Sequence, residues 1–469
     1  MVTLQTCAFT SFADLIPPQN IASPSPLIGR GELFSQKGLR SPPLARAPLP
    51  ADNARMTAAV TARPETAPRV HDILVAGAGV VGLAFACAVK QAIGRRLKVA
   101  VVDPRMSEGD GGLKTVALAA GSRGLLARVG AWDALEPLTQ PILKMSIFDG
   151  GPRDAVRLVQ LEFEAREGET LAHMAFADDV VAALLETARA HGVEMIRGAV
   201  AGFGPGRDVA RIDLADGGSL SARLVVAADG ARSKLRALAE IPTVGWETGQ
   251  AGLVATIAHA RDHQGRAEQH FLPSGPFAIL PLPGRRSSIV WNESTADAKA
   301  LLALGPQDFL EQLERRFTLK LGAIEVASRV ESFPLSFRVA REFVSERLAL
   351  IGDAAHLVHP LAGQGLNLGL RDVAALAEAV VEPLRLGLDP ADAATLQKYQ
   401  RGRRFDVVSS GMGMDAMNRL FSNDIEPLRF ARDLGLRLVD RAPALKRWFA
   451  AEAAGASARA PRLLRGEGL

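Results

Sequence analysis

The feature that most constrains the fold is a glycine turn between an apolar strand and a helix. Residues 71–94 read HDILVAGAGVVGLAFACAVKQAIG, which predicts a buried strand from Ile73 to Ala76 and a helix that runs to about Ile93. A second strand, LKVAVVD, ends at Asp103. Because parallel strands joined by a helix build α/β sheets, this β-α-β unit predicts an α/β fold.

The glycine spacing in GAGVVG indicates dinucleotide binding. Gly77 allows the tight turn, Gly79 lets the backbone approach a pyrophosphate, and Gly82 lets helix and strand pack closely. The helix start also offers unpaired N–H groups and a positive dipole end to phosphates. Asp103 lies 21 residues after Gly82, where a carboxylate can accept hydrogen bonds from a ribose. A merely structural glycine turn is the alternative, and the motif alone does not separate FAD from NAD. The residues expected at the cofactor are Gly77, Ala78, Gly79, Val80, Val81, Gly82 and Asp103.

A second glycine-rich segment, IGDAAHLVHPLAGQGLN at 351–367, follows another buried strand. Asp353, His356 and His359 recur every third residue, but Pro360 bars one continuous helix from carrying all three. A metal site would also need three or four ligands with supporting groups, so we expect no metal here. AGQG leads instead into a helix whose N-terminal amides can face an electron-rich, partly anionic ring system. For His356 and His359, packing and backbone hydrogen bonds are favoured over a general-base role.

Composition and charge limit the other functional classes. The net charge of +4 arises from 55 basic and 51 acidic residues, and the basic residues are spread out, which argues against nucleic-acid binding. No apolar stretch approaches the roughly 18 to 20 residues that a bilayer span needs. Cys7 and Cys87 lie far apart and form neither a disulfide framework nor a CxxC site, which indicates a reducing compartment.

Several further motifs follow in order between about 70 and 455. Together with GAGVVGL, they are KTVALAAGS, VVAADGARSKLR, WETGQ, FLPSGPFAILPLP, ALIGDAAHLVHPLAGQGLNLGLRD and NRLFSND. This combination resembles the flavin-dependent aromatic hydroxylases with the p-hydroxybenzoate hydroxylase fold, and most closely the ubiquinone-biosynthesis ring hydroxylases. The resemblance implies an α/β fold in which a Rossmann-like FAD-binding domain carries an inserted antiparallel-sheet substrate domain and C-terminal helices.

The strand and helix patterns agree with such an organisation. Residues 246–340 are mostly strand-like and contain one predicted helix, PQDFLEQLERRF, which predicts an antiparallel sheet in a separate lobe. The expected parts are an N-terminal extension (1–68), a FAD-binding domain (69–137, 178–245 and 341–385), a substrate domain (138–177 and 246–340) and a C-terminal helical region (386–469). The extension is either disordered and transit-like or untranslated, with Met56 as the true start, and we favour the second.

The resemblance also implies roles for individual residues. Asp353 is expected at the ribityl chain of FAD, and Asp229 with Gly230 matches a second fingerprint implicated in NAD(P)H use, although a β-turn and a capped helix also explain that stretch. Lys114 stands where the family usually has an arginine that reaches the FAD phosphates, and Thr248 replaces the tyrosine of the family's WDYGQ. The residues expected beside the isoalloxazine are Pro360, Gly363, Gln364, Gly365, Leu366 and Asn367.

The implied activity is an FAD-dependent monooxygenase reaction of ubiquinone biosynthesis. NAD(P)H would reduce the flavin, O2 would form a C4a-hydroperoxyflavin, and one oxygen atom would pass to a polyprenylated phenol. We name no catalytic side chain, because the cofactor supplies the redox and oxygen chemistry while the protein excludes water. The alternatives are a flavin hydroxylase of a small soluble aromatic and an inactive flavin-binding subunit of a quinone-synthesis complex.

The insoluble substrate implies where such an enzyme would work. We expect a cytoplasmic protein that contacts the inner face of the membrane or joins a quinone-biosynthesis complex. The segment IEPLRFARDLGLRLVDRAPALKRWFAAEAAG could be an amphipathic contact helix, but packing against the main body is favoured.

Overall fold

The computed structural model describes residues 70–106, 114–149, 159–317, 319–358, 363–422, 454–455 and 460–469. All of them belong to one of two units of the chain, Pro64–Leu469, and the other unit is Met1–Arg63. The predictions for residues 1–68, for His359 and Pro360, and for nearly all of the segment 425–455 therefore lie outside the described residues.

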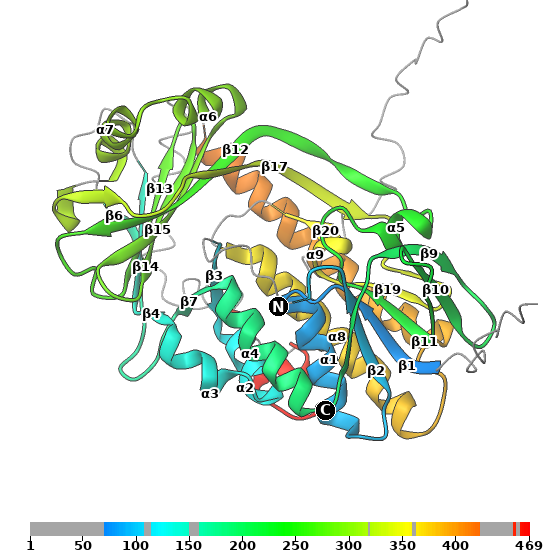
Figure 1. The fold of residues 1–469 in the computed structure, drawn as a ribbon. Helices are drawn as coiled ribbons and strands as arrows, with labels where there is room; N and C mark the ends of the chain where they lie inside the picture. The colour runs from blue at the N-terminus through cyan, green and yellow to red at the C-terminus, as the bar shows by residue number, and fades with distance from the viewer. Residues whose placement is uncertain are drawn as a thin grey trace, which may run out of the picture. The chain divides into compact units, whose positions relative to one another are not determined.

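The first sheet forms around the predicted β-α-β unit (Figure 1). β1 (Val70–Ala76), α1 (Val80–Ile93) and β2 (Val99–Asp103) follow one another, and β1 pairs in parallel with β2 and with β11 (Ser219–Ala227). Its central strands are apolar because they are buried on both faces. The strand order is β18-β19-β11-β1-β2-β8, and a β9-β10 hairpin adds to β11. The remaining strands are β8 (Glu194–Arg197), β9 (Val200–Gly204), β10 (Ala210–Leu214), β18 (Val344–Ser345) and β19 (Leu348–Leu350).

The second sheet comes largely from the segment predicted to be rich in strands. It is antiparallel apart from the parallel pair of β13 with β5, and its order is β20-β17-β12-β15-β14-β13-β5-β6, with β16 on β12. The domain boundaries given above remain a prediction. The strands are β5 (Lys144–Asp149), β6 (Val159–Glu164), β12 (Thr243–His259), β13 (Arg266–Leu272), β14 (Gly275–Leu282), β15 (Arg286–Ser294), β16 (Ile324–Val326), β17 (Glu331–Ala340) and β20 (His356–Leu357).

One expectation about this lobe is wrong, because it contains two helices instead of one. α6 (Thr295–Leu302) precedes the predicted helix α7 (Pro306–Phe317). The side chain of Ser294 accepts a hydrogen bond from the amide of Asp297 and caps α6, a short-range signal that the strand pattern of SSIVWNES obscured.

A third, small sheet lies between helices of the first layer and the second sheet. β3 (Thr115–Ala119) and β4 (Gln140–Ile142) flank β7 (Ala172–Phe176). β3 contacts α8 (Gln364–Arg385), while β4 and β7 contact β14 of the second sheet. The small sheet therefore bridges the helices of the first layer and the strands of the second sheet.

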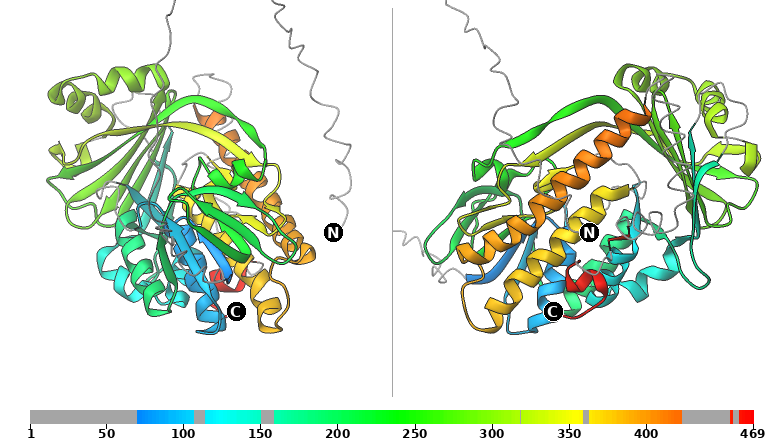
Figure 2. Two further views of the ribbon diagram at one scale, coloured as in Figure 1. Left: turned by 45° about the vertical axis from the view of Figure 1, so that its right-hand side comes forward. Right: turned by 180° about the vertical axis from the view of Figure 1, so that it is seen from behind.

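Helices pack beside the parallel sheet and connect it to the second sheet. α1 packs against α4 (Ala177–Ala190) and α8, and α9 (Ala393–Phe421) runs along α8 and reaches β14 and β17 (Figure 2). The other helical segments are α2 (Ala120–Val129), α3 (Trp132–Leu135), α5 (Lys234–Leu238), and the 3-10 turns η1 (Glu136–Leu138), η2 (Leu319–Leu321), η3 (Gly352–Ala354) and η5 (Arg462–Arg465).

The two largest of three apolar clusters leave one face of the second sheet available for a site. The larger core joins the parallel sheet to its helices. In the smaller core, Phe309, Leu313 and Phe317 of α7 pack on Phe277 and Trp291 of the second sheet. Because side chains alternate along a strand, the residues next to these in sequence point to the opposite face of the sheet.

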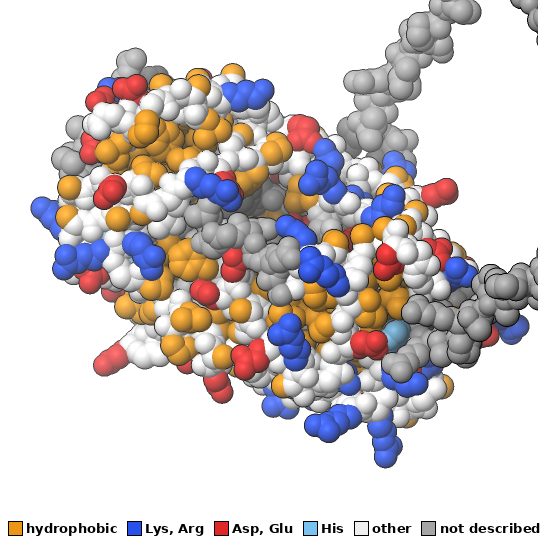
Figure 3. Space-filling model, in the orientation of Figure 1, with side chains coloured by type: hydrophobic (Ala, Val, Ile, Leu, Met, Phe, Trp, Pro, Cys, Tyr) orange, Lys and Arg blue, Asp and Glu red, His pale blue; other side chains and the backbone are white. Residues whose placement is uncertain are grey.

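The surface and the helix lengths add two observations. Within the described residues, no helix is both long and apolar enough to cross a bilayer. On the face shown in Figure 3, basic and acidic side chains are interspersed over most of the surface, and basic side chains predominate along the lower right edge.

Candidate functional site

A chamber of about 1290 Å³ lies at the carboxyl ends of four parallel strands. Ala76 of β1, Val102 of β2, Ala228 after β11 and Ile351 after β19 all line it. Ligands of open α/β sheets bind at this edge of the sheet. The volume exceeds the roughly 300 to 1,000 Å³ of a pocket for one drug-sized ligand, so a cofactor and a substrate can share it.

Most of the residues predicted to bind the cofactor line this chamber. They are Gly77, Gly79, Val80, Val81, Asp103, Lys114, Asp229, Gly230, Asp353, Gly363, Gln364, Gly365, Leu366 and Asn367. Ala78 and Gly82 do not line it, and Pro360 lies outside the described residues. The structure thus gathers segments that are up to 290 positions apart in the sequence into one cavity, since Gly77 and Asn367 both line it.

The first glycine turn leaves open space only where a ligand would need it. A Cβ on Gly77 would lie 2.3 Å from the carbonyl oxygen of Ala228, and one on Gly82 would lie 2.0 Å from that of Gly77. At Gly79, by contrast, no heavy atom lies within 4 Å of a Cβ. Gly79 is also the N-cap of α1 and has no side chain to cap the helix, so the first amides of α1 have no side-chain partner there. The turn can therefore accept a phosphate at close range.

Asp103 organises the loop after β2. Its Oδ2 accepts a hydrogen bond from the amide of Ala78 at 3.0 Å, and its Oδ1 accepts from the amides of Arg105 and Met106 at 2.8 and 3.0 Å. Both oxygens thus have backbone partners already. The ribose contact expected for Asp103 remains a prediction, and it would use the remaining acceptor capacity of a carboxylate.

Asp229, in the second fingerprint, has one bonded and one free carboxylate oxygen. Its Oδ2 accepts from the amides of Lys234 and Leu235 at the start of α5, at 2.7 and 3.2 Å. Its Oδ1 is buried and has no partner. Arg236 connects this segment to the late loop by donating from Nη1 to the carbonyl of Ala354 at 2.8 Å. A ligand that donates a hydrogen bond to Asp229 would satisfy the orphan oxygen.

The late loop presents Asp353 to the chamber. Asp353 sits in the 3-10 turn η3, directly after Gly352, whose φ is 60°. The Asp353 side chain is exposed, and among the described residues nothing donates to its carboxylate. An exposed, unbonded carboxylate that lines a cavity is suited to accept hydrogen bonds from a polyol chain.

Asn367 joins the beginning of α8 to β3. Its Nδ2 donates to the carbonyls of Ala117 and Gly363 at 2.9 and 3.0 Å, and its Oδ1 accepts from the amide of Ala119 at 3.0 Å and from Ser122 Oγ at 2.6 Å. These four bonds use the whole amide, so a contact of Asn367 with a flavin would come from its backbone.

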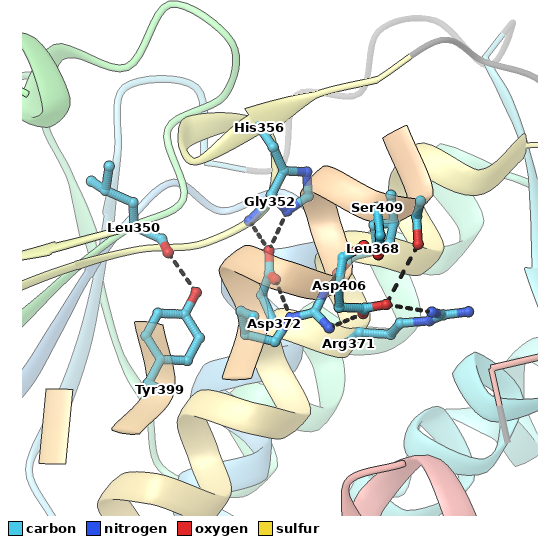
Figure 4. Close-up of polar contacts among 11 residues, drawn as sticks. Leu350, Gly352, His356, Leu368, Arg371, Asp372, Tyr399, Asp406 and Ser409 are labelled. Carbon is cyan, nitrogen blue, oxygen red and sulfur yellow. Dashed lines mark hydrogen bonds and ion pairs between the residues drawn. The ribbon is translucent and has the colours of Figure 1, made fainter. Parts of the chain in front are cut away.

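A buried charge network, not predicted from the sequence, holds the late loop from behind (Figure 4). Asp372 of α8 accepts at Oδ2 from the amide of Gly352 at 2.9 Å and contacts Nε2 of His356 at 2.6 Å. Its Oδ1 accepts from Nε of Arg403 at 2.7 Å, and Arg403 also pairs with Asp406. The Asp372 and His356 side chains are 0% and 1% exposed. His356 therefore anchors the loop and does not line the chamber. It is packed as expected, but its hydrogen-bond partner is the Asp372 carboxylate and not the backbone.

The charges of this network offset the cost of burial. Burial raises the pKa of Asp372, but His356 and Arg403 act in the opposite direction by charge and by hydrogen bonds, and the net pKa is lowered. The pKa of Tyr399 is raised well above its usual value, first by burial and then by the charge of Asp372. Tyr399 therefore stays a neutral phenol that donates to the carbonyl of Leu350 at 2.7 Å.

The two departures from the family motifs differ in position. Lys114 is exposed and lines the chamber, so its ammonium can reach an anionic group there. Thr248 does not line the chamber. Its Oγ1 donates to the carbonyl of Leu335 at 2.8 Å and accepts from the amide of Gln250.

Sequence reasoning missed Asp372, although a signal existed. The helix LNLGLRDVAALAEAVV places Asp372 between Leu368 and Leu376 on one helical face, and an acidic residue on an apolar stripe indicates a buried partner. It also missed Gln269 and Asn292, two buried amides that line the chamber from the second sheet. The strand pattern of that sheet did not tell which face is the chamber wall.

The chamber fits a flavin dinucleotide on three observations. Gly79 leaves space against the start of a helix, Asp229 has an orphan buried oxygen, and the unbonded carboxylate of Asp353 lies in the same cavity. Phosphates, hydroxyl groups and a polar ring edge would each meet a matching group.

The role of Asp353 gives the first prediction. Asp353→Ala should weaken FAD binding by roughly 1.5 to 3 kcal/mol, the range for a hydrogen bond to a charged group. The unfolding midpoint of the apoprotein should not change, because the carboxylate has no partner among the described residues. Titration of the refolded apoprotein with FAD, followed by flavin fluorescence, measures the first quantity. Unchanged FAD affinity would remove Asp353 from the site.

Comparison with known proteins finds relatives over most of the chain. A family model described as "FAD binding domain" matches residues 70–408. Ubiquinone hydroxylase UbiL of Rhodospirillum rubrum is 40% identical over 91% of this chain and 99% of that protein. The 3-demethoxyubiquinol 3-hydroxylase of Escherichia coli is 32% identical over 80% of this chain and 96% of its own length. The crystal structure of p-nitrophenol 4-monooxygenase PnpA from Pseudomonas putida, 20% identical, matches with a TM-score of 0.68 over 82% of this chain and 98% of that one, which confirms the predicted fold.

Proposed function

The chain belongs to the FAD-dependent monooxygenases of ubiquinone biosynthesis, and on that premise we propose that it hydroxylates the aromatic ring of a polyprenylated phenol. O2 would supply the oxygen atom and NAD(P)H the electrons. The names of two relatives, a ubiquinone hydroxylase and a 3-demethoxyubiquinol 3-hydroxylase, support a substrate of this class.

The observation that carries the proposal is the continuity of the chamber. The cavity that contains Gly79 and Asp353 at the parallel sheet also contains Val254, Ala278 and Val290 of the second sheet. A cofactor bound at the first wall would share its cavity with a substrate at the second. Such an arrangement brings the two reacting groups together and removes them from bulk water.

We assign the first wall to FAD. When bound, FAD supplies the redox and oxygen chemistry that side chains cannot provide. The amides at the start of α1 and the ammonium of Lys114 would hold its phosphates, and Asp353 would accept from the ribityl hydroxyls. The amides at the start of α8, after Gly363, would lie beside the ring system. These residues bind and orient, and none of them transfers a proton in the proposal.

We assign the second wall to the substrate. Its side chains are mostly small or apolar, among them Ala267, Leu280 and Phe333. An apolar wall favours a polyprenyl tail by roughly 25 cal/mol for each Å² of apolar surface removed from water. The same wall keeps water away from the reacting groups.

The nicotinamide donor would approach from the side of the second fingerprint. Arg232 and Lys234 are exposed and line the chamber next to Asp229. Basic side chains at a cavity wall attract the phosphates of a dinucleotide. In this proposal NAD(P)H binds only transiently, and FAD and the substrate occupy the main cavity.

The expected cellular location of the enzyme follows from its substrate. A phenol with a polyprenyl tail partitions into lipid, so we infer contact with a membrane surface at the cytoplasmic face or with a quinone-biosynthesis complex. Co-sedimentation of the full-length protein with vesicles tests the membrane contact. Recovery of the protein in the supernatant at all lipid concentrations would reject it.

The decisive experiment combines a deletion with turnover by the purified protein. A deletion strain should accumulate a quinone precursor that lacks one hydroxyl group, identified by mass spectrometry of extracted lipids. The purified yellow protein should oxidise NAD(P)H faster when that precursor is present, and under ¹⁸O2 one labelled oxygen atom should enter the product. A product without label, or a normal quinone profile in the deletion strain, would reject the proposed function.

A further inference from the structure

Three buried polar atoms without a partner belong to residues that line the chamber. Within the described residues these are Asp229 Oδ1, Gln269 Nε2 and Asn292 Oδ1. Asp229 lies at the wall that we assign to FAD. Gln269 and Asn292 lie on the second sheet, at the wall that we assign to the substrate.

Gln269 and Asn292 share one face of the sheet. Gln269 of β13 stands opposite Ala278 of β14, and Ala278 stands opposite Val290 of β15. Asn292 follows Val290 by two residues and so points to the same side. The two amides are 5% and 3% exposed, and the apolar side chains of Ala267, Ala278 and Val290 lie beside them on this face.

Their lack of partners contrasts with a nearby glutamine. The amide of Gln250 on β12 donates from Nε2 to the carbonyl of Ser274 at 3.0 Å and accepts at Oε1 from Asn418 at 2.9 Å. In contrast, no side-chain hydrogen bond joins Gln269 or Asn292 to any described residue. A buried amide without a partner costs stability, so such groups in a cavity wall indicate a ligand that supplies the partner.

We propose that the side-chain amides of Gln269 and Asn292 form the polar seat that binds the ring oxygens of the aromatic substrate. Each amide offers one donor group and one acceptor, whichever way its oxygen and nitrogen are assigned. A phenol hydroxyl both donates and accepts, so it can bond to either amide, and a second ring oxygen can bond to the other. The apolar tail would lie along Ala267, Ala278 and Leu280. This inference rests on the proposed function, because it assigns the second wall to the substrate.

Two model ligands that differ by one hydroxyl group test the seat in the FAD-loaded protein. Geranyl phenol and geranylbenzene are titrated, and binding is followed by the change in flavin absorbance. Gln269→Met keeps the length of the side chain and removes the amide. It should weaken binding of geranyl phenol about tenfold, the equivalent of one hydrogen bond, and leave binding of geranylbenzene unchanged. The thermal midpoint of the variant should stay level or rise, because an unsatisfied buried group has been removed.

The matched control is Gln250→Met, the same substitution where both amide atoms are bonded within the chain. It should lower the thermal midpoint and keep the wild-type preference for the phenol over the benzene. If Gln269→Met does not fold, Asn292→Leu carries the same test on the other amide. Equal loss of both ligands, or no loss of the phenol, would overturn the seat.

Binding and turnover separate this inference from the proposed function. Wild-type protein that prefers the phenol but never hydroxylates it would contradict the function and keep the seat. Wild-type protein that hydroxylates the phenol while Gln269→Met and Asn292→Leu bind it normally would contradict the seat and keep the function.

Discussion

A Gly79→Val variant should fold normally and lose FAD. Its backbone φ of −77° and ψ of 177° suit valine, and no heavy atom lies within 4 Å of the new Cβ. The side chain would instead occupy the space that the pyrophosphate needs at the start of α1. We expect FAD affinity to fall by about a thousandfold, which corresponds to about 4 kcal/mol. The thermal midpoint of the apoprotein and a titration with FAD measure the two effects.

Substitutions at two other glycines serve as controls for this result. Gly204 at the end of β9 has equally open space around a Cβ, but it does not line the chamber, so Gly204→Val should keep both fold and FAD. Gly82→Val should fail to fold, because its Cβ would lie 2.0 Å from the Gly77 carbonyl oxygen. Full retention of FAD by Gly79→Val would show that the phosphates lie elsewhere.

The second large effect is expected at Asp372, which does not touch the chamber. Asp372→Asn leaves His356 and Arg403 buried without their carboxylate, and removal of one partner from such a pair costs about 3 to 5 kcal/mol. FAD affinity should fall as well, because the amide of Gly352 loses the oxygen that fixes the turn before Asp353. Urea unfolding of the apoprotein and a titration with FAD report the two losses separately.

The pH dependence of stability identifies the group. The pKa of Asp372 in the folded protein lies below its ordinary value of 3.8. When folding lowers the pKa of a carboxyl group, the group stabilises the folded protein. This stabilisation is fully present above the pKa of the unfolded state and is lost as the pH falls through the pKa of the folded state. Wild type and Asp372→Asn should therefore differ most at neutral pH, and their unfolding free energies should converge below pH 3.8.

An exposed ion pair provides the control for Asp372. Asp213 accepts from Nε of Arg211 at 2.7 Å, and both side chains are largely exposed. Asp213→Asn should change the unfolding free energy by less than about 1 kcal/mol and leave FAD binding unchanged. If Asp372→Asn behaved like this control, the network would not anchor the late loop.

The parts that sequence alone predicted are those determined over short distances. β1, α1 and β2 follow from apolar runs and glycine positions within 33 residues, from His71 to Asp103. The late loop was recognised by its motif, and its beginning, Gly352 to Ala355, is fixed by local turns. The grouping of most of the predicted residues around one chamber agrees with the expected site, although their contacts with FAD remain predictions.

The parts that sequence did not predict depend on which distant residues meet. Nothing near Asp372 in sequence shows that Arg403, 31 residues later on another helix, supplies its counter-charge. Gln269 and Asn292 lie in strands that carry both polar and apolar residues on each face. The sequence pattern therefore did not show which face lines the chamber. Pairing of strands and packing of helices, which are long-range, decided these positions.

The hydrogen bonds of Asn367 also determine how late during translation this part of the structure can form. The amide of Ala119 bonds to a side chain 248 residues later in the chain. At about 5 to 20 residues per second, a ribosome needs roughly 12 to 50 seconds to make that interval. Through this period the growing chain carries the glycine turn of α1 and the apolar strands around it without β19 and α8. On the proposed assignment of the late loop to FAD, the cofactor would be loaded only after α8 has been made, and the nascent chain must avoid aggregation until then.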